Sequence, residues 1–216
     1  MKLLKISIAA FLVLFVISCG SSQQDQAKAK LTTPQGTEKV AVFAGGCFWG
    51  MQEGFSELKG VASATSGYAG GTTKNPTYDE VNTETTGHAE AVQVVYDPSI
   101  ISFKQLLDVF FVVHDGTQLN RQGPDIGTSY RSIAFYTNEE EKTQIEEAIA
   151  KSNTSQLHLG QIVTEVRPMA TFYPAEKYHQ NYVKLNPNQS YVTAVCGPKL
   201  DKLRSAFPNL LKDAFK

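Results

Sequence analysis

The sequence predicts an α+β protein, in which a mixed β-sheet is packed against helices in a two-layer sandwich. Apolar or alternating runs typical of strands occur at 40–44, 91–96 and 132–136. Segments whose apolar residues recur at helical spacing lie between them, and this interleaving favours a sandwich. With 216 residues, of which 42% are hydrophobic, the chain can form one core and an appendage.

The charge balance bears on the partners of the protein. The formal net charge is −1 and only 19% of the residues are charged. A nucleic-acid-binding surface requires a basic patch or stripe, and the sequence contains no long basic block. We therefore expect no nucleic acid partner.

The first 18 residues are expected to be a secretion signal. Two lysines flank an apolar run at 6–17, which is shorter than the ~20 residues needed to span a bilayer. Residues 16–18, Val-Ile-Ser, stand directly before Cys19, and this order resembles the cleavage box of bacterial lipoproteins. The resemblance implies cleavage before Cys19 and attachment of lipid to its sulfur. An ordinary secretory signal and an uncleaved membrane anchor are the alternatives.

The expected domain boundaries follow from this signal. Residues 19–38 are rich in Ser, Gln, Thr and Lys, and they predict a flexible tether with an end-to-end distance of roughly 25 Å. The folded domain is expected over 39–207, and a C-terminal tail over 208–216. A lipid-anchored protein of this kind would lie in the bacterial cell envelope and face outside the cytoplasm.

A glycine-rich stretch at 45–50, Gly-Gly-Cys-Phe-Trp-Gly, joins an apolar strand to a segment, 51–58, that can continue as a helix. This arrangement places Cys47 at a helix N-terminus, where partial positive charge is expected to favour its ionised form. Local context leaves two interpretations open. Cys47 is either a nucleophile beside an apolar wall of Phe48 and Trp49, or a structural cysteine in the core.

The other cysteines constrain the redox chemistry. If Cys19 carries lipid, Cys47 and Cys196 are the two remaining thiols. A compartment outside the cytoplasm permits a disulfide between them. The sequence has no Cys-x-x-Cys motif, which disfavours both a structural zinc site and a thioredoxin-type redox pair.

Two polar, glycine-bearing loops are expected at 66–78 and 120–131, where they can present polar side chains. Between them, strict alternation puts Glu90 on the same face as the apolar residues of strand 91–96. Desolvation at the edge of an apolar face would raise the pKa of Glu90 and suit it to act as a general acid. The alternative is a solvated glutamate at a strand end.

The remaining elements are predicted from capping and periodicity. Ser102 and Gln105 form a capping box for a helix whose buried face comprises Phe103, Leu106, Leu107, Phe110 and Val113. The later elements are a helix from Thr137 to about Lys151, a strand over 161–166, a helix from Pro174 to about Leu185, and a last helix over 199–207 that Pro208 ends.

Several motifs occur together in this chain. They are Gly-Cys-Phe-Trp-Gly at 46–50, Gly-Tyr-Ala-Gly-Gly at 67–71, Asn-Pro-Thr-Tyr at 75–78, Gly-His-Ala-Glu at 87–90, Arg-Gln-Gly-Pro-Asp-Ile-Gly-Thr-Ser-Tyr-Arg at 121–131 and Phe-Tyr-Pro-Ala-Glu-Lys-Tyr-His-Gln at 172–180. As a set, they resemble the A-type peptide methionine sulfoxide reductases over about residues 40–205. The resemblance implies a ferredoxin-like core, reduction of the S epimer of methionine sulfoxide, and no metal or organic cofactor.

The resemblance also implies roles for the reacting groups. Cys47 matches the nucleophile, which attacks the sulfoxide sulfur as a thiolate and becomes a sulfenic acid. Glu90 matches the carboxylic acid that protonates the sulfoxide oxygen. Three other motif residues, Tyr68, His88 and His179, are expected to have packing roles.

Five further residues match groups that bind the substrate. Tyr78 and Tyr130 match hydroxyls that orient the sulfoxide oxygen, since a phenol donates a hydrogen bond without carrying charge. Phe48 and Trp49 match the apolar pocket for the substrate methyl group. Asp125 matches a carboxylate that positions substrate or water.

One departure from the family pattern concerns the return of the enzyme to its reduced state. Many members carry a resolving cysteine directly after a tyrosine, whereas here Tyr191 is followed by Val192 and the cysteine is Cys196. Cys196 either forms a disulfide with Cys47 that a thioredoxin-like partner reduces, or is buried while an external thiol reduces Cys47. The apolar neighbours of Cys196 favour the second outcome.

Two other functions compete with the reductase. A cysteine hydrolase would use Cys47 with His88, His114 or His179 as the base, but it leaves the tyrosines and Glu90 without a purpose. A non-enzymatic surface lipoprotein would bind peptides in the aromatic cleft. For a reductase, we expect a monomer whose partners are oxidised proteins or free methionine sulfoxide, a thioredoxin-like electron donor and, through its lipid, a membrane.

Overall fold

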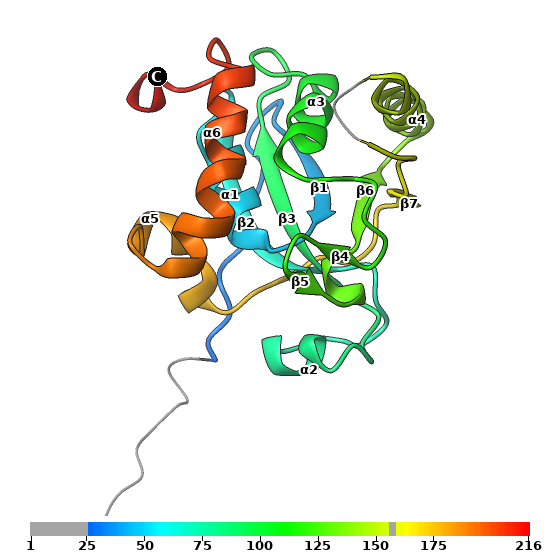
Figure 1. Ribbon diagram of the computed structural model, residues 1–216, viewed down its shortest axis with the longest axis vertical. Helices are drawn as coiled ribbons and strands as arrows, with labels where there is room; N and C mark the ends of the chain where they lie inside the picture. The colour runs from blue at the N-terminus through cyan, green and yellow to red at the C-terminus, as the bar shows by residue number, and fades with distance from the viewer. Residues whose placement is uncertain (1–25, 156–158) are drawn as a thin grey trace, which may run out of the picture.

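The computed structural model describes residues 26–155 and 159–216 (Figure 1). The expected signal sequence and the lipidation site at Cys19 lie outside these residues. Within the described part of the chain, every helix is too short or too polar to cross a bilayer.

A six-stranded mixed sheet forms the centre of the fold, with the strand order β7-β6-β1-β3-β2-β8. Four pairs of neighbouring strands are antiparallel, and β6 and β7 are parallel. The strands are β1 Lys39–Gly45, β2 Val61–Ala69, β3 Ala89–Tyr96, β6 Ser132–Tyr136, β7 Glu165–Pro168 and β8 Tyr173–Pro174. The inner order β6-β1-β3-β2, with one helix after β1 and one after β3, is that of a split β-α-β ferredoxin-like core.

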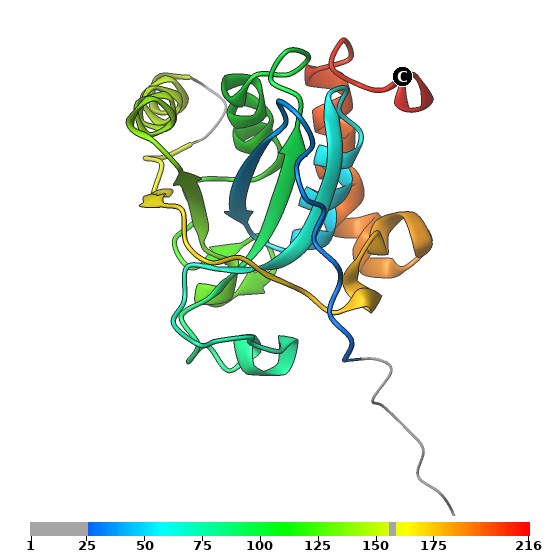
Figure 2. The same cartoon turned by 180° about the vertical axis from the view of Figure 1, so that it is seen from behind.

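The major helices lie on one side of this sheet, as Figure 1 shows. They are α1 Phe48–Ser56, α3 Phe103–Val113, α4 Glu139–Thr154 and α6 Gly197–Ala206. Seen from behind in Figure 2, the other face is crossed by extended chain instead of helices. This confirms the predicted α+β class and two-layer arrangement.

Short elements complete the fold. They are α2 Tyr78–Asn82, the two-stranded sheet of β4 Arg121–Gln122 and β5 Asp125–Ile126, 3₁₀ turns at Thr128–Tyr130, Lys177–His179 and Asp213–Phe215, α5 Tyr182–Leu185 and a π-helical turn at Val192–Cys196.

The main core lies between the sheet and the helices. Phe43 of β1 stacks on Phe55, Phe103 and Phe110 with ring centroids 5.4, 5.9 and 5.1 Å apart. Stacked aromatic pairs at this spacing add to the stabilisation from burial. The Ser102–Gln105 capping box is present, and the predicted apolar face of α3 is buried.

Three secondary-structure predictions were wrong. The stretch predicted as a loop from residue 66 continues β2 to Ala69, because β2 pairs with β3 on one side and β8 on the other. The helix predicted from Pro174 to about Leu185 is β8, then a 3₁₀ turn and the four-residue α5, since residues 173–174 pair with 67–68. The strand predicted at 161–166 begins at Glu165.

Parts of the expected tether and of the expected tail contact the domain. Within the tether, residues 27–29 pair with 175–177, through Ala29 N–H to Ala175 O (2.9 Å) and Lys177 N–H to Ala27 O (2.8 Å). The tail packs on the domain as well, since the Lys212 N–H donates to Glu57 O (2.8 Å). Polar composition was a poor guide for the tether, because backbone pairing does not depend on apolar side chains.

We predict that Leu211→Ala lowers the free energy of unfolding by about 2–3 kcal/mol, the usual cost of truncating a buried leucine. Leu211 is only 1% exposed, and it pairs with Leu58. Urea denaturation measures the change, with Leu185→Ala as a matched control on an exposed leucine. Equal stability of the two variants would mean that residues 208–216 are a tail after all.

Candidate active site

Cys47 is held at the N-terminus of α1 by the glycine that precedes it. Gly46 has φ +84°, and a Cβ there would lie 2.4 Å from the side chain of Gln122. Only glycine adopts this positive φ without strain and, having no Cβ, avoids a clash with Gln122. The chain therefore turns sharply out of β1 and places Cys47 at the N-cap of α1, where it is 8% exposed.

The first turn of α1 brings three reactive side chains together. The N–H of Phe48 donates to Glu90 Oε2 (3.0 Å), the N–H of Trp49 to the Cys47 sulfur, and the N–H of Gly50 to the Cys196 sulfur. These backbone N–H groups have no partner within the helix. The helix terminus thus organises one carboxyl group and two thiols.

Glu90 reaches this terminus from β3. Because β1 and β3 are antiparallel, the start of β3 lies beside the end of β1. Glu90 is 2% exposed, and its burial raises the pKa from 4.5 to about 8, although the Phe48 N–H opposes the shift. Asp125 and Glu84 add to the increase through their negative charge. The predicted desolvation of Glu90 is confirmed, and the group is mostly protonated near neutral pH.

The expectation for the ionisation of Cys47 was wrong in direction. Burial, followed by the charge of Glu90, raises the pKa of the Cys47 thiol well above its ordinary value. Hydrogen bonds from the Trp49 N–H and the Tyr191 hydroxyl act in the opposite direction but are weaker. A helix terminus contributes typically 0.3–1 kcal/mol, which desolvation easily exceeds.

Tyr78 and Tyr130 come from separate elements on the opposite side of the site. Tyr78 is the first residue of α2, and Tyr130 ends the 3₁₀ turn after β5. Burial raises the pKa of both phenols, and they are hydrogen-bonded to each other. Both therefore remain neutral donors. Glu84, two residues after the end of α2, links α2 to the 3₁₀ turn that carries Tyr130. Its carboxylate accepts from the backbone N–H and the hydroxyl of Ser129 in that turn (2.9 and 2.6 Å).

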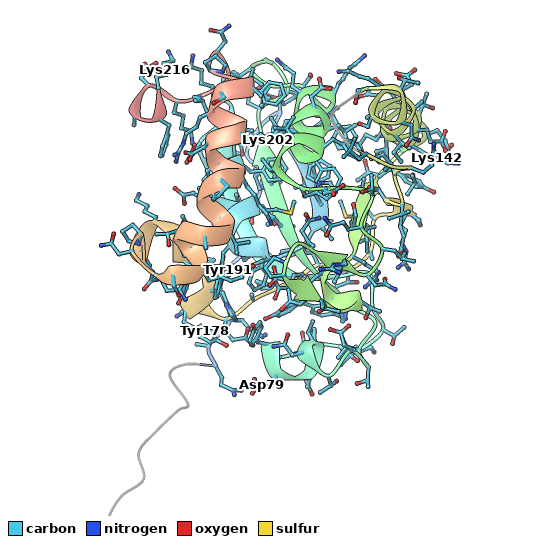
Figure 3. All side chains as sticks on the ribbon, viewed as in Figure 1. Asp79, Lys142, Tyr178, Tyr191, Lys202 and Lys216 are labelled. Atoms are coloured by element: carbon cyan, nitrogen blue, oxygen red, sulfur yellow. The ribbon has the colours of Figure 1, made fainter. Side chains whose placement is uncertain are left out.

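Tyr191 is a site residue that the sequence analysis missed. Its hydroxyl donates to Asp125 Oδ2 (2.5 Å) and also contacts the Cys47 sulfur. Figure 3 shows Tyr191 at the same end of the molecule as Asp79 of α2. The sequence did contain a clue to Tyr191. It follows Asn186-Pro187, in the segment where many members of the family that the motifs resemble carry a resolving cysteine.

The aromatic wall beside Cys47 is fixed by stacking and hydrogen bonding. Trp49 stacks on Tyr182, with ring centroids 3.8 Å apart and planes 10° apart. Its indole N–H donates to His179 Nδ1 (3.1 Å), and Phe48 also contacts the His179 ring, with centroids 5.0 Å apart. Burial lowers the pKa of His179 to about 4, so the ring is neutral.

These groups surround one cavity of about 250 Å³, lined by Cys47, Phe48, Trp49, Tyr78, Glu90, Asp125, Tyr130, Gln189 and Tyr191. All seven residues predicted as catalytic or substrate-binding are therefore brought together. Cys196 is not in the lining. It is 1% exposed and packs with Val183, Val192 and Leu200, as its apolar neighbours predicted.

The three residues assigned to packing are placed accordingly. The hydroxyl of Tyr68 donates to Glu176 (2.8 Å). His88 accepts from the Gly71 N–H (3.1 Å) and contacts Thr73 O (2.8 Å), which fixes the glycine loop. In the described part of the chain, no group of three or more His, Cys, Asp or Glu side chains could hold a metal ion.

The fold and the site together define a class of protein. A buried thiol, a protonated carboxylic acid and neutral phenols line one small cavity with an aromatic wall. Such a set can protonate an oxygen while sulfur attacks its neighbour, which is the chemistry of a thiol-dependent oxidoreductase.

Comparison with known proteins identifies the family. The sequence model of the peptide methionine sulfoxide reductases matches residues 39–210. The MsrA of Pasteurella multocida is 51% identical over 173 residues, which are 80% of this chain and 98% of that protein. The MsrA of Deinococcus radiodurans is 46% identical over 192 residues, covering 89% and 93%.

Solved structures agree with this assignment. Reduced Mxr1 from Saccharomyces cerevisiae has a TM-score of 0.68 and 31% identity, covering 73% of this chain and 91% of that one. Methionine sulfoxide reductase A of Corynebacterium diphtheriae has a TM-score of 0.65 and 32% identity, covering 78% and 92%. The chain belongs to the peptide methionine sulfoxide reductases of the A type. It is an oxidoreductase that reduces methionine sulfoxide, so the hydrolase and the non-enzymatic alternatives are set aside.

We predict that Glu90→Gln stabilises the fold increasingly as pH rises. An unfolded glutamate titrates near 4.5 and Glu90 near 8, so the folded state binds an extra proton between these values. Wild-type stability therefore falls as pH rises through this window. Glutamine avoids this loss, and its advantage reaches on the order of 3 kcal/mol at pH 7.

Urea unfolding of wild type and Glu90→Gln at pH 5, 6, 7 and 8 measures this difference. Glu146→Gln, on the exposed face of α4, is the matched control on a solvated glutamate. A constant difference across this pH range would contradict the raised pKa of Glu90.

We predict that Tyr191→Phe lowers kcat/KM about tenfold, because the hydroxyl that contacts the Cys47 sulfur and donates to Asp125 is lost. The pKa of Cys47, measured from the pH dependence of its alkylation, is expected to rise further. Tyr136→Phe, at the far end of β6 from the site, serves as the control. An unchanged pH dependence of alkylation would show that the Tyr191 hydroxyl does not affect the pKa of Cys47.

Proposed function

We propose that this reductase acts on the S epimer of methionine sulfoxide, free or in proteins, with Cys47 as the nucleophile and Glu90 as the acid. The observation that carries the proposal is the convergence of Cys47, Glu90, Tyr78 and Tyr130 on a single cavity. The roles of these residues follow from their chemistry and positions.

The reaction moves one oxygen atom and two electrons. The Cys47 sulfur attacks the sulfoxide sulfur while Glu90 gives its proton to the sulfoxide oxygen. The sulfur–oxygen bond of the substrate breaks and oxygen passes to Cys47, which leaves methionine and a Cys47 sulfenic acid. Cysteine sulfur is oxidised by two electrons and the substrate sulfur is reduced by two.

The protonation states of Cys47 and Glu90 are coupled. Glu90 in its charged form is, after burial, the largest influence that raises the pKa of Cys47. When Glu90 carries its proton, the thiolate loses this like-charge neighbour, and the N–H of Trp49 and the hydroxyl of Tyr191 stabilise it. Protonation of Glu90 therefore removes one cause of the raised pKa of Cys47 and eases formation of the thiolate that the reaction needs.

Epimer selection follows from three fixed contacts around a chiral sulfur. Phe48 and Trp49 form an apolar wall for the methyl group, while Tyr78 and Tyr130 are donors for the oxygen. Cys47 must approach the sulfur from a third direction. A site that fixes the methyl group, the oxygen and the line of attack accepts one epimer, and the family resemblance indicates the S form.

Recycling requires two thiols for each turnover, which become a disulfide as oxygen leaves as water. We propose that an external thiol reduces the Cys47 sulfenic acid directly. Cys196 lies outside the lining of the cavity that holds Cys47, and burial raises the pKa of the Cys196 thiol to about 11. Mxr1, whose fold this chain shares, has been solved in complex with Trx2. A thioredoxin-like donor is therefore the proposed source of the external thiol.

The cellular setting is a separate part of the proposal. The apolar run at 6–17 and the residues before Cys19 support a lipid-anchored protein of the bacterial cell envelope. There the enzyme would repair oxidised proteins as a monomer on its anchor. Labelling with a radioactive fatty acid, with Cys19→Ala as the unlabelled control, tests the anchor.

The central test is turnover of the separated S and R epimers with dithiothreitol. We predict that the S epimer is reduced at least about 100-fold faster, because the R epimer cannot satisfy the methyl, oxygen and attack positions together. Cys47→Ser should be inactive and Glu90→Gln should be slow. Equal rates for both epimers would overturn the stereochemical proposal, and an active Cys47→Ser variant would overturn the mechanism.

The recycling proposal is tested by intact mass after one equivalent of substrate without reductant. We predict a gain of one oxygen on Cys47, since Cys196 lies outside the lining of the cavity that holds Cys47. Cys196→Ala should give the same product and the same dithiothreitol-supported turnover. A loss of two hydrogens in the wild type, absent from Cys196→Ala, would instead establish a Cys47–Cys196 disulfide.

A further inference from the structure

The N-terminal segment at 27–29 docks on the domain, although it lies ahead of residues 39–210, which the sequence model of the family matches. It forms backbone hydrogen bonds with residues 175–177, and Lys28 and Glu176 pair in an isolated antiparallel β-bridge. In Figure 2 this segment runs along the back of the molecule toward the extended chain after β7. Its position raises the question of what it contributes to the site.

Lys28 makes the decisive contacts of this segment. Its ammonium donates to Pro76 O (2.7 Å) and to Glu176 Oε1 (2.5 Å), and it lies 5.0 Å from the centre of the Tyr68 ring. The Lys28 side chain is 30% exposed, whereas that of Glu176 is 3% exposed. The interaction is therefore largely shielded from solvent.

Glu176 connects Lys28 to the residues behind the active site. Its Oε1 also accepts from the backbone N–H of Tyr78 (3.2 Å), and its Oε2 accepts from the hydroxyl of Tyr68 (2.8 Å). Burial opposes the charged form, but the hydrogen bonds from Lys28 and Tyr68 keep the pKa of Glu176 below its ordinary value. A buried carboxylate of this kind depends on its cation.

Together these contacts hold both sides of Thr77, the N-cap of α2. Lys28 binds the carbonyl of Pro76, and Glu176 binds the N–H of Tyr78. The phenol of Tyr78 projects from this point into the cavity beside Cys47. The pose of that phenol thus depends on a backbone that Lys28 and Glu176 fix.

We propose that Lys28 is a positioning residue of the reductase, which fixes the 76–78 backbone through Pro76 and Glu176 and so directs the Tyr78 hydroxyl at the sulfoxide oxygen. The inference rests on the proposed role of Tyr78. It gives the segment ahead of the family domain a part in the reaction, besides any part it has in linking the domain to an anchor.

Loss of the ammonium has an electrostatic consequence. The titratable groups around Glu176 are Lys28, Tyr68 of β2 and His179, which is neutral. Without Lys28, no cation of this set remains, and Glu176 takes up a proton at a higher pH. A protonated carboxyl group is a poorer acceptor for the Tyr78 N–H, so the position of Tyr78 becomes dependent on pH.

The test compares Lys28→Met, Lys28→Arg and Tyr78→Phe in the full chain with S-methionine sulfoxide and dithiothreitol. Lys30→Met is the matched control, because Lys30 is exposed and two residues away in the same segment. We expect Lys28→Met to lower kcat about tenfold with KM changed less than about twofold, and to introduce a loss of kcat toward acidic pH. Lys28→Arg should restore most of the rate, and Lys30→Met should match wild type.

A double variant separates positioning from general destabilisation. In a Tyr78→Phe background, Lys28→Met is expected to cause no further loss of kcat, since the hydroxyl that Lys28 directs is already absent. All assays are run well below the melting temperature of each variant, measured in parallel. The positioning role would be overturned if the two substitutions lowered kcat independently, so that their effects multiplied in the double variant. It would also be overturned if Lys28→Met had the kcat and the pH dependence of the wild type.

The two proposals fail in different ways. If Tyr78→Phe itself leaves kcat unchanged, the role of the Tyr78 hydroxyl is wrong and the Lys28 inference falls with it. If Tyr78→Phe is slow and Lys28→Met is normal, only the inference about Lys28 is wrong.

Discussion

The hydrogen bond from the Phe48 N–H to Glu90 is the contact on which the site depends. It joins the start of α1 to the start of β3, and it exists because β1 and β3 are antiparallel neighbours. The next two N–H groups of the same turn hold the sulfurs of Cys47 and Cys196. One helix terminus thus sets the relative positions of the acid and the nucleophile.

The rest of the fold supplies the other side of the cavity. Tyr78 and Tyr130 stand on short elements that have little core of their own, and two carboxylates, Glu84 at the surface and Glu176 in the interior, fix them from behind. Glu84 binds the turn that carries Tyr130, and Glu176 binds the backbone of Tyr78. Two carboxylates that take no part in the reaction therefore determine the positions of the Tyr78 and Tyr130 hydroxyls.

Much of the fold and site could be predicted from the sequence, and the failures have physical causes. Periodicity and capping identified β1, β3, β6 and α3 because their patterns reflect local burial. The helix expected from Pro174 was wrong because pairing with β2 is a long-range interaction. The ionisation of Cys47 was wrong because desolvation depends on the tertiary environment, and Tyr191 was missed because its contact with Asp125 spans a large sequence separation.

The high pKa of Cys47 has a consequence for an enzyme that works among oxidants. Peroxide reacts with thiolates far faster than with thiols, and over-oxidation to sulfinic acid is irreversible in most proteins. A nucleophile that stays protonated until substrate and acid are both in place presents little thiolate to small oxidants. Burial of Cys47 slows its intrinsic reactivity, and the same burial protects the nucleophile from irreversible over-oxidation.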